Sequence, residues 1–397
     1  MEIRDYHDDD LPAVRRIWQE VGWVDEDEAE QLAPFLEDAH AVVAELDGSA
    51  EACTSIHDGH LHHTGTDLPL SVVTSVTTSR VGRKQGLARA TLDTSLRRAA
   101  ERGNVVSILG MFEQGFYDRS GFGTGAEMLI YRLDPGTLRA DLPYRRPVRL
   151  GLDDVEEMVA CSMRRARVHG GVLLASVAQR RAERAWDEGG FGLGYRDESG
   201  ELTHFLWSTS KGEHGPYDVR DWAWQTTDQL LELLGLLRSL GDQVRSVIVP
   251  EPSALQLAVL IQQPGRQKLT RSSGDHRYQR WPSAWWQARI LDLEPCIAAL
   301  PASDDLHCNL RVTDPLDLDG VAGDWTLHLG AEPHVTRGHE EDLPLLSCSV
   351  NALTRLWLGV RPATTLATTD DITASPELLA ALDGAVRLPR PDVQSDF

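Results

Sequence analysis

The sequence contains few cysteines and no long apolar segment. Its five cysteines are spread over 397 residues without paired spacing, so neither a disulfide framework nor a zinc-binding set organises the chain. No apolar run approaches the roughly 20 residues that cross a bilayer. Residues 1–5 lack the basic segment and apolar core of a secretory signal. We therefore expect a cytoplasmic protein with no membrane association and no bound metal.

Positive charge is also scarce. The chain has 39 Lys and Arg against 61 Asp and Glu, which gives a net charge of −22. A surface of this sign repels nucleic acid and anionic lipid, and it raises the rate at which polycations encounter the protein. The composition therefore argues against a nucleic-acid partner and is compatible with a cationic small-molecule partner.

The length of the chain predicts two or three domains. Residues up to about 140 predict a helix, a hairpin, a strand, a second helix and further strands, which is the order of an α/β unit. A similar order recurs over residues 150–250 and indicates a degenerate internal repeat. The remaining residues predict the short strands and helices of an α+β unit. We expect domains at residues 1–143, 144–284 and 285–397, with a strand at 128–133 in the first.

A turn rich in backbone donors joins the predicted strand 70–78 to the helix that begins near Leu87. Successive N–H groups and the helix dipole can surround a pyrophosphate at such a turn. Gly86 lets the backbone approach a phosphate closely, and Arg83 and Lys84 add positive charge. By itself, the pattern is equally typical of an ordinary basic turn.

A second motif follows about 30 residues later. Arg83-x-x-Gly86-x-Ala88, taken together with Tyr117-x-x-x-Gly121-Phe122, resembles the GNAT acyltransferase superfamily. The resemblance implies acetyl-CoA as cosubstrate, with the strand before the turn lining the pantetheine arm. The residues that it places around acetyl-CoA are Val76, Thr77 and Thr78 along the pantetheine, Arg83, Lys84, Gln85, Gly86, Leu87, Ala88 and Arg89 at the phosphates, and Phe112 and Glu113 beside the thioester.

Tyr117 has the chemistry that the transfer needs. Attack of an amine on a thioester expels a thiolate, which requires a proton or a strong hydrogen bond. A tyrosine with an ordinary pKa near 10 is protonated at neutral pH. We therefore expect Tyr117 to be the general acid.

Over its whole length the chain resembles the enhanced-intracellular-survival (Eis) acetyltransferases, which acetylate aminoglycoside amines. The C-terminal part of the resemblance rests on Leu356-Trp357-Leu358-Gly359, on Thr364-Thr365-Leu366-Ala367 and on a terminal phenylalanine. It implies tandem GNAT-fold domains, the second degenerate, followed by a sterol-carrier-protein-like α+β domain. It also implies a homo-oligomer, a hexamer in that family. The α-carboxylate of Phe397 is then the base, acting through water, with Asp396 beside it as a second anion.

The acceptor pocket is less well defined by the sequence. Trp18, Trp23, Asp25 and Glu26 lie where the wall of the family's pocket would be, and aromatic faces with carboxylates suit an amino sugar. The local sequence is not similar to the family, however, and Trp18 is equally consistent with a core residue. His57 is another candidate base, within a histidine-rich stretch that we expect to be mainly a solvated loop.

Two other functions fit the same residues. The acceptor is a protein lysine or a natural polyamine in one of them. In the other, the chain is a lipid carrier with the GNAT parts as scaffold. The second unit has Gln225-Thr226-Thr227 where the first has its glycine-containing turn, so we expect no phosphate-binding site there.

Overall fold

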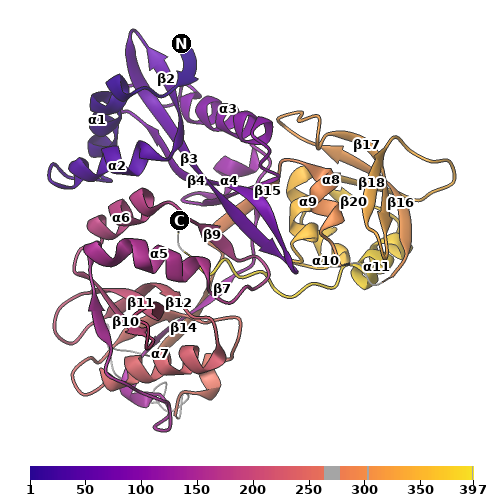
Figure 1. Ribbon diagram of the computed structural model, residues 1–397. Coiled ribbons are helices and arrows are strands. Elements are labelled where there is room, and N and C mark those ends of the chain that lie inside the picture. The colour runs from indigo at the N-terminus through magenta and orange to yellow at the C-terminus, as the bar shows by residue number, and fades with distance from the viewer. Residues whose placement is uncertain (263–277, 302–303, 396) are drawn as a thin grey trace.

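The computed structural model describes residues 1–262, 278–301, 304–395 and 397. Figure 1 shows three units arranged around a central junction, in indigo, magenta and orange to yellow along the chain. The C-terminus lies at this junction, between the first and second units. Among the described residues, no helix is long and apolar enough to cross a membrane.

The first unit is built on an antiparallel meander followed by a parallel strand. Strands β1 to β4 pair antiparallel in chain order, and β5 pairs parallel to β4. The strands and helices are β1 (Glu2–Asp5), α1 (Leu11–Val21), α2 (Leu32–Glu37), β2 (His40–Leu46), β3 (Ser49–His63), β4 (Thr66–Thr78), α3 (Leu87–Glu101), β5 (Val106–Gly110), α4 (Gln114–Asp118) and β6 (Gly123–Thr124).

The second unit repeats this pairing. Strands β8, β10, β11 and β12 pair antiparallel, and β13 pairs parallel to β12. The predicted internal repeat is therefore confirmed. Its elements are β8 (Val148–Leu150), α5 (Val155–Met163), β9 (Val172–Leu174), α6 (Val177–Trp186), β10 (Gly190–Arg196), β11 (Leu202–Ser210), β12 (Tyr217–Ala223), α7 (Thr227–Ser239), β13 (Val247–Pro250) and β14 (Gln279–Ser283).

The two units contribute strands to each other's sheets, and β9 of the second unit pairs antiparallel with β3 of the first. Strand β7 (Met128–Leu133) lies between β13 and β14 in the second sheet, while β15 (Trp286–Ile290) lies between β5 and β6 in the first. The expected boundaries at residues 143 and 284 therefore do not follow the sheets, and the placement of 128–133 in the first unit is wrong. Local sequence predicts that a segment is extended, whereas its partner strand is chosen by tertiary packing.

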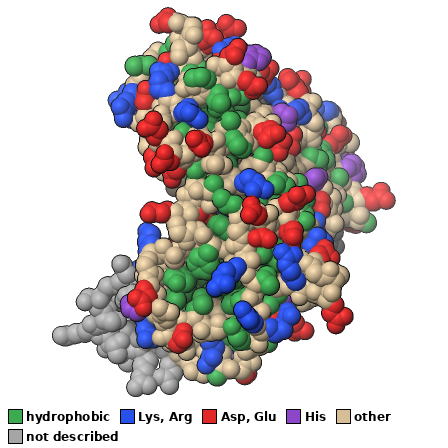
Figure 2. All heavy atoms as spheres, turned by 60° about the vertical axis from the view of Figure 1, so that its left-hand side comes forward, with side chains coloured by type: hydrophobic (Ala, Val, Ile, Leu, Met, Phe, Trp, Pro, Cys, Tyr) green, Lys and Arg blue, Asp and Glu red, His purple; other side chains and the backbone are tan. Residues whose placement is uncertain are grey.

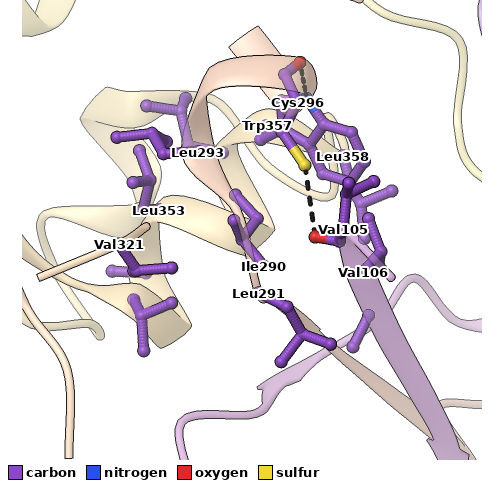
Figure 3. Close-up of a cluster of buried hydrophobic side chains, with 14 of the residues drawn as sticks. Val105, Val106, Ile290, Leu291, Leu293, Cys296, Val321, Leu353, Trp357 and Leu358 are labelled. Carbon is purple, nitrogen blue, oxygen red and sulfur yellow. Dashed lines mark hydrogen bonds between the residues drawn. The ribbon is translucent and has the colours of Figure 1, made fainter. Parts of the chain in front are cut away.

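The third unit shares a core with the first. In Figure 3, the Trp357 indole donates to the Cys296 carbonyl (2.7 Å), and the Cys296 thiol contacts the Val105 carbonyl (3.6 Å). Apolar side chains of both units fill the space around these contacts. The elements are α8 (Leu293–Ala298), β16 (Leu306–Thr313), β17 (Gly323–Leu329), β18 (His334–Arg337), β19 (Leu345–Ser349), α9 (Val350–Trp357), α10 (Ala363–Leu366), β20 (Ile372–Thr373) and α11 (Pro376–Ala385).

The tail after α11 returns to the junction of the units. Its backbone bonds to the second unit from Asp392 N to the His169 carbonyl (2.9 Å) and from Val172 N to the Val393 carbonyl (3.1 Å). Arg165, which is 5% exposed, donates from Nη1 to the Gln394 carbonyl (3.0 Å). These contacts fix the course of the chain up to its last residues.

Candidate active site

Strands β4 and β5 separate at the centre of the first sheet. Their parallel pairing runs from Leu70 with Val106 to Val73 with Leu109, and β4 then continues to Thr78. Beyond Val73, the edge of β4 on this side has no partner strand within the described chain. Its backbone N–H and C=O groups, those of Val76 to Thr78 among them, can therefore pair with an extended ligand. The side chain of Thr77 turns to β3, where it donates to the Cys53 carbonyl (3.3 Å).

The turn after β4 leads directly into the N-terminus of α3. Gly86 is the N-cap with φ of +79°, and no side chain caps the helix. The first N–H groups of α3 are consequently left without the partner that a capping residue would supply. A methyl group added at Gly86 would meet no protein atom within 4 Å, so glycine is needed for its left-handed φ, and the space beside it is open to a ligand.

The predicted phosphate-binding side chains differ in how available they are. Arg83, Lys84 and Gln85 are exposed at the turn, and the Gln85 amide donates to the Val81 carbonyl (2.8 Å). Leu87 is buried and can contribute only its backbone. Arg89 pairs with Asp93 (3.3 Å) and donates to the Arg119 carbonyl (3.0 Å). The guanidinium of Arg89 therefore holds the loop after Tyr117.

Tyr117 lies in α4 within a cluster of aromatic side chains. Its ring is 5.5 Å from that of Phe112, 5.0 Å from Phe116 and 6.2 Å from Phe122. Tyr117 is 3% exposed, and burial raises the pKa of its hydroxyl well above the usual range. In the part of the chain that the structure describes, this hydroxyl has no hydrogen-bond partner. It is therefore protonated and free to donate.

Phe112 and Glu113 occupy the segment between β5 and α4. The side chain of Phe112 is 71% exposed, and that of Glu113 is exposed at the N-terminus of α4. Both residues therefore lie at the opening between β4 and β5, on the path from Gly110 to Tyr117.

The last residue of the chain is next to the same opening. A methyl group added at Gly110, the final residue of β5, would lie 3.2 Å from a terminal oxygen of Phe397. The Phe397 ring packs against Trp285 with centroids 5.0 Å apart, and the backbone carbonyl of Trp285 accepts a hydrogen bond from Met111 N (2.8 Å). The structure thus places the backbone oxygen of Phe397 near the point where β4 and β5 separate. Asp396 lies outside the described residues.

Trp18, expected at the acceptor pocket, is a core residue. It is 3% exposed and packs against Trp23, Phe35 and Trp186 at centroid distances of 5.2, 5.4 and 5.6 Å. It shares the buried side of α1 with Val14 and Ile17. The spacing of these residues on the helix is the signal that favours the core reading.

The other expected acceptor residues are accessible. Trp23 is 47% exposed, and Asp25 and Glu26 are exposed. One carboxylate oxygen of Asp25 accepts the N–H groups of Asp27 (3.0 Å) and Glu28 (2.9 Å). Asp25 therefore shapes its own turn as well as contributing charge.

His57 does not lie in a solvated loop. It belongs to β3 and is 1% exposed, and its ring nitrogens contact the Phe35 carbonyl (3.1 Å) and the Thr74 hydroxyl (3.0 Å). Burial lowers its pKa to about 4. Both nitrogens are engaged in a neutral ring, so His57 is poorly placed to remove a substrate proton. Among the described residues, no cluster of His, Cys, Asp and Glu has the arrangement of a metal site.

Sequence reasoning missed the residues that place the tail. Gly110, Trp285 and Arg165 contact it from β5, from the segment before β15 and from the second unit. The only signal in the sequence was the pair of tryptophans at residues 285 and 286, directly after the boundary that we expected at residue 284.

The fold and this site define an acyltransferase domain fused to a repeated unit and a smaller α+β domain. Residues 2–125 match the acetyltransferase (GNAT) domain family, and residues 293–393 match the sterol carrier protein domain family. A relative from Streptomyces avermitilis, described as an uncharacterized N-acetyltransferase, is 25% identical over 335 residues, which cover 76% of this chain and 74% of the relative.

Solved structures share the fold over the whole chain. Eis1 from Mycobacterium abscessus has a TM-score of 0.77 at 19% identity, with 100% of both chains covered. A GCN5-related N-acetyltransferase from Kribbella flavida has a TM-score of 0.76 at 18% identity, covering 100% of this chain and 98% of the other. Residues 2–125 therefore form a GNAT acetyltransferase domain, and the whole chain shares its fold with Eis1 from Mycobacterium abscessus.

Proposed function

We propose that the chain transfers the acetyl group of acetyl-CoA directly to a primary amine of an aminoglycoside or similar polyamine, in a ternary complex. The observation that carries this proposal is the position of the Phe397 carboxylate beside Gly110, at the point where β4 and β5 separate. A buried, protonated tyrosine follows on α4. An acid and a base thus flank one opening.

The residues around the turn fit acetyl-CoA. The uncapped N-terminus of α3 and the exposed Arg83 and Lys84 supply N–H groups and positive charge for the phosphates. The unpaired edge of β4 supplies backbone groups for the pantetheine arm. The thioester then lies near Gly110, where the strands meet.

One catalytic group acts on the attacking amine, and the other acts on the leaving thiolate. The Phe397 carboxylate accepts the proton of the ammonium through a water molecule, and the amine attacks the thioester carbonyl. As the C–S bond breaks, Tyr117 donates its proton to the departing thiolate, and the proton that the new amide nitrogen loses restores the phenol. A carboxylate is a weak base toward an ammonium, so the nearby aromatic groups must also lower the pKa of the bound amine by limiting its hydration.

The surface charge favours a cationic acceptor. Acidic side chains are spread over the face seen in Figure 2, in keeping with the net charge of −22. Such a field raises the encounter rate with polyamines and weakens with added salt.

The test is steady-state turnover of acetyl-CoA on three acceptors: an aminoglycoside, spermidine and a lysine-containing peptide. We expect Tyr117→Phe to lower kcat about 100-fold, the lower end for general acid catalysis, with acetyl-CoA affinity unchanged by calorimetry. Tyr144→Phe is the matched control, since Tyr144 is 53% exposed. If only the peptide is acetylated, the acceptor is a protein lysine and not an aminoglycoside or polyamine. Absence of turnover on all three acceptors would refute the proposal.

We also propose that the protein is a cytoplasmic homo-oligomer, a hexamer by the family resemblance. The five cysteines are buried and free, as in a reducing compartment. Light scattering on the eluting protein should give six times the chain mass of 43.9 kDa. A mass equal to one chain would contradict the oligomer.

A further inference from the structure

The second unit contains a cleft of about 400 Å³ that corresponds in position to the β4–β5 opening. Strands β12 and β13 pair only through Tyr217 with Val247 and Asp218 with Ile248, and β12 continues to Ala223. The cleft lies where these two strands separate. The repeat has therefore kept the central opening of the fold.

The N-terminus of α7 next to this opening is unsuited to a phosphate. The Thr226 side chain accepts from Gln229 N (3.3 Å) and forms a capping box with Gln229. The equivalent helix of the first unit, α3, has no such cap. A capped terminus has fewer N–H groups to offer an anion, so the cleft is not a second acetyl-CoA site.

The walls of the cleft are rich in tryptophan. Trp222 and Trp224 come from β12, Trp281 from β14 and Trp285 from the segment before β15. The rings of Trp222 and Trp224 are 5.3 Å apart at an angle of 80°. Indole faces attract cations more strongly than any other side-chain ring.

The charged lining is net negative. Asp218, Glu251, Asp392 and Arg220 line the cleft, and Arg220 lies 3.7 Å from Asp218 and 4.0 Å from Asp187. Arg220 is thus balanced by its own partners. Glu251 accepts the backbone N–H group of Leu257 (2.8 Å), and Asp392 accepts those of Ser253 and Gln394 (both 3.1 Å). Neither carboxylate forms an ion pair within 4.0 Å among the described residues, and Arg280 and Arg165 interact with them electrostatically at longer range.

Trp285 connects the cleft to the catalytic carboxylate. Its indole lines the cleft and also packs on the Phe397 ring. The Trp285 Nε1–H is buried without a hydrogen-bond partner among the described residues. Ser395, two residues before the end of the chain, lines the cleft as well. One indole therefore separates the cleft from the reacting end of the tail.

We propose that this cleft binds the distal cationic part of a long amine acceptor while its reacting amine lies at Phe397. The indoles supply cation–π attraction, and Glu251 and Asp392 supply charge. The inference rests on the proposed function, since it extends the acceptor site of the same reaction. It predicts a preference for elongated polyamines over short monoamines.

The test compares spermine with propylamine at 0.15 M salt in Trp281→Ala and Glu251→Gln variants of the full chain. We expect the ratio of kcat/KM for spermine to that for propylamine to fall at least fivefold in each variant. Trp281 is half-buried on the edge strand β14, so its removal leaves the sheet paired. Glu188→Gln removes the same charge from an exposed site of the second unit outside the cleft, and should leave the ratio unchanged.

The outcomes separate this inference from the proposed function. An unchanged ratio in both cleft variants, or an equal fall in Glu188→Gln, overturns the cleft assignment while amine acetylation stands. If neither amine is acetylated by the wild type, the proposed function fails. The cleft assignment is then tested by calorimetric binding of spermine. Loss of binding in the two cleft variants but not in Glu188→Gln supports the assignment, and equal binding in all variants overturns it.

Discussion

The ion pair between Arg289 and Asp314 joins the exchanged strand β15 to the third unit. Both side chains are 0% exposed, and Arg289 Nη2 lies 3.0 and 3.1 Å from the two carboxylate oxygens. Arg289 Nη1 also donates to the Ser120 carbonyl, in the loop that follows Tyr117. Asp314→Asn removes the negative charge and leaves the buried guanidinium without its counter-ion.

The size of the effect follows from this burial. Breaking a fully buried pair costs about 3–5 kcal/mol. For 397 residues that unfold together with an entropy of about 2.1 cal/mol/K per residue, this corresponds to a fall in Tm of about 4–6 °C. The measurement is thermal denaturation by calorimetry at pH 7.5.

The chain offers a matched control for this variant. Asp324 pairs with Arg311 at 2.7 Å, but the two side chains are 45% and 49% exposed. An exposed pair contributes about 0–1 kcal/mol, so Asp324→Asn should shift Tm by about 1 °C or less. Equal shifts in the two variants would refute the argument that burial decides the contribution of the pair.

Three further variants test the turn, a buried histidine and the tail. Gly86→Val forces a β-branched residue to φ of +79° and fills the open space, so acetyl-CoA affinity by calorimetry should fall at least about tenfold, a loss of about 1.4 kcal/mol; an unchanged affinity contradicts the phosphate site. His57 has a folded pKa of about 4, below the unfolded value of about 6.5, so the unfolded state binds more protons in this window and stability is lost as pH falls below 6.5. Between pH 7.5 and 5.0, the free energy of unfolding of His57→Gln should therefore fall by about 2 kcal/mol less than that of the wild type, as measured by urea denaturation. An equal fall in both proteins refutes the assignment. Arg165→Met removes a charged donor from the Gln394 carbonyl, a bond of about 1.5–3 kcal/mol, and should lower kcat about tenfold or more with acetyl-CoA affinity retained; an unchanged kcat would show that this anchor is dispensable.

Local signals in the sequence located the elements well. The predicted strand 70–78 and the helix that begins near Leu87 agree with β4 and α3, and the third unit contains the short helices that we expected, because each has its own periodicity or cap. For example, Ser349 and Ser375 accept the N–H groups of Ala352 (3.3 Å) and Leu378 (3.2 Å). The tandem fold with a third α+β unit was likewise within reach of the sequence.

Strand partners and side-chain environments could not be predicted from the sequence. The exchange of β7 and β15 depends on which sheet edge each strand meets, and extended segments carry little information about that choice. Trp18 looked like a pocket residue because aromatic side chains suit both a core and a binding site. The tryptophan cleft was invisible for a related reason, since its four indoles are brought together from β12, β14 and the segment before β15.

The central claim is that the terminal carboxylate of Phe397 is the catalytic base. Protein ligation can produce the full chain ending in a Phe397 amide, which keeps the ring on Trp285 and the tail contacts and removes only the negative charge. The measurement is kcat on an aminoglycoside, with acetyl-CoA affinity measured alongside. The account predicts a loss of about 100-fold or more in kcat at unchanged affinity. Full activity of the Phe397-amide protein would contradict this claim. The exposed carboxylates near Asp25 would then be the candidate bases.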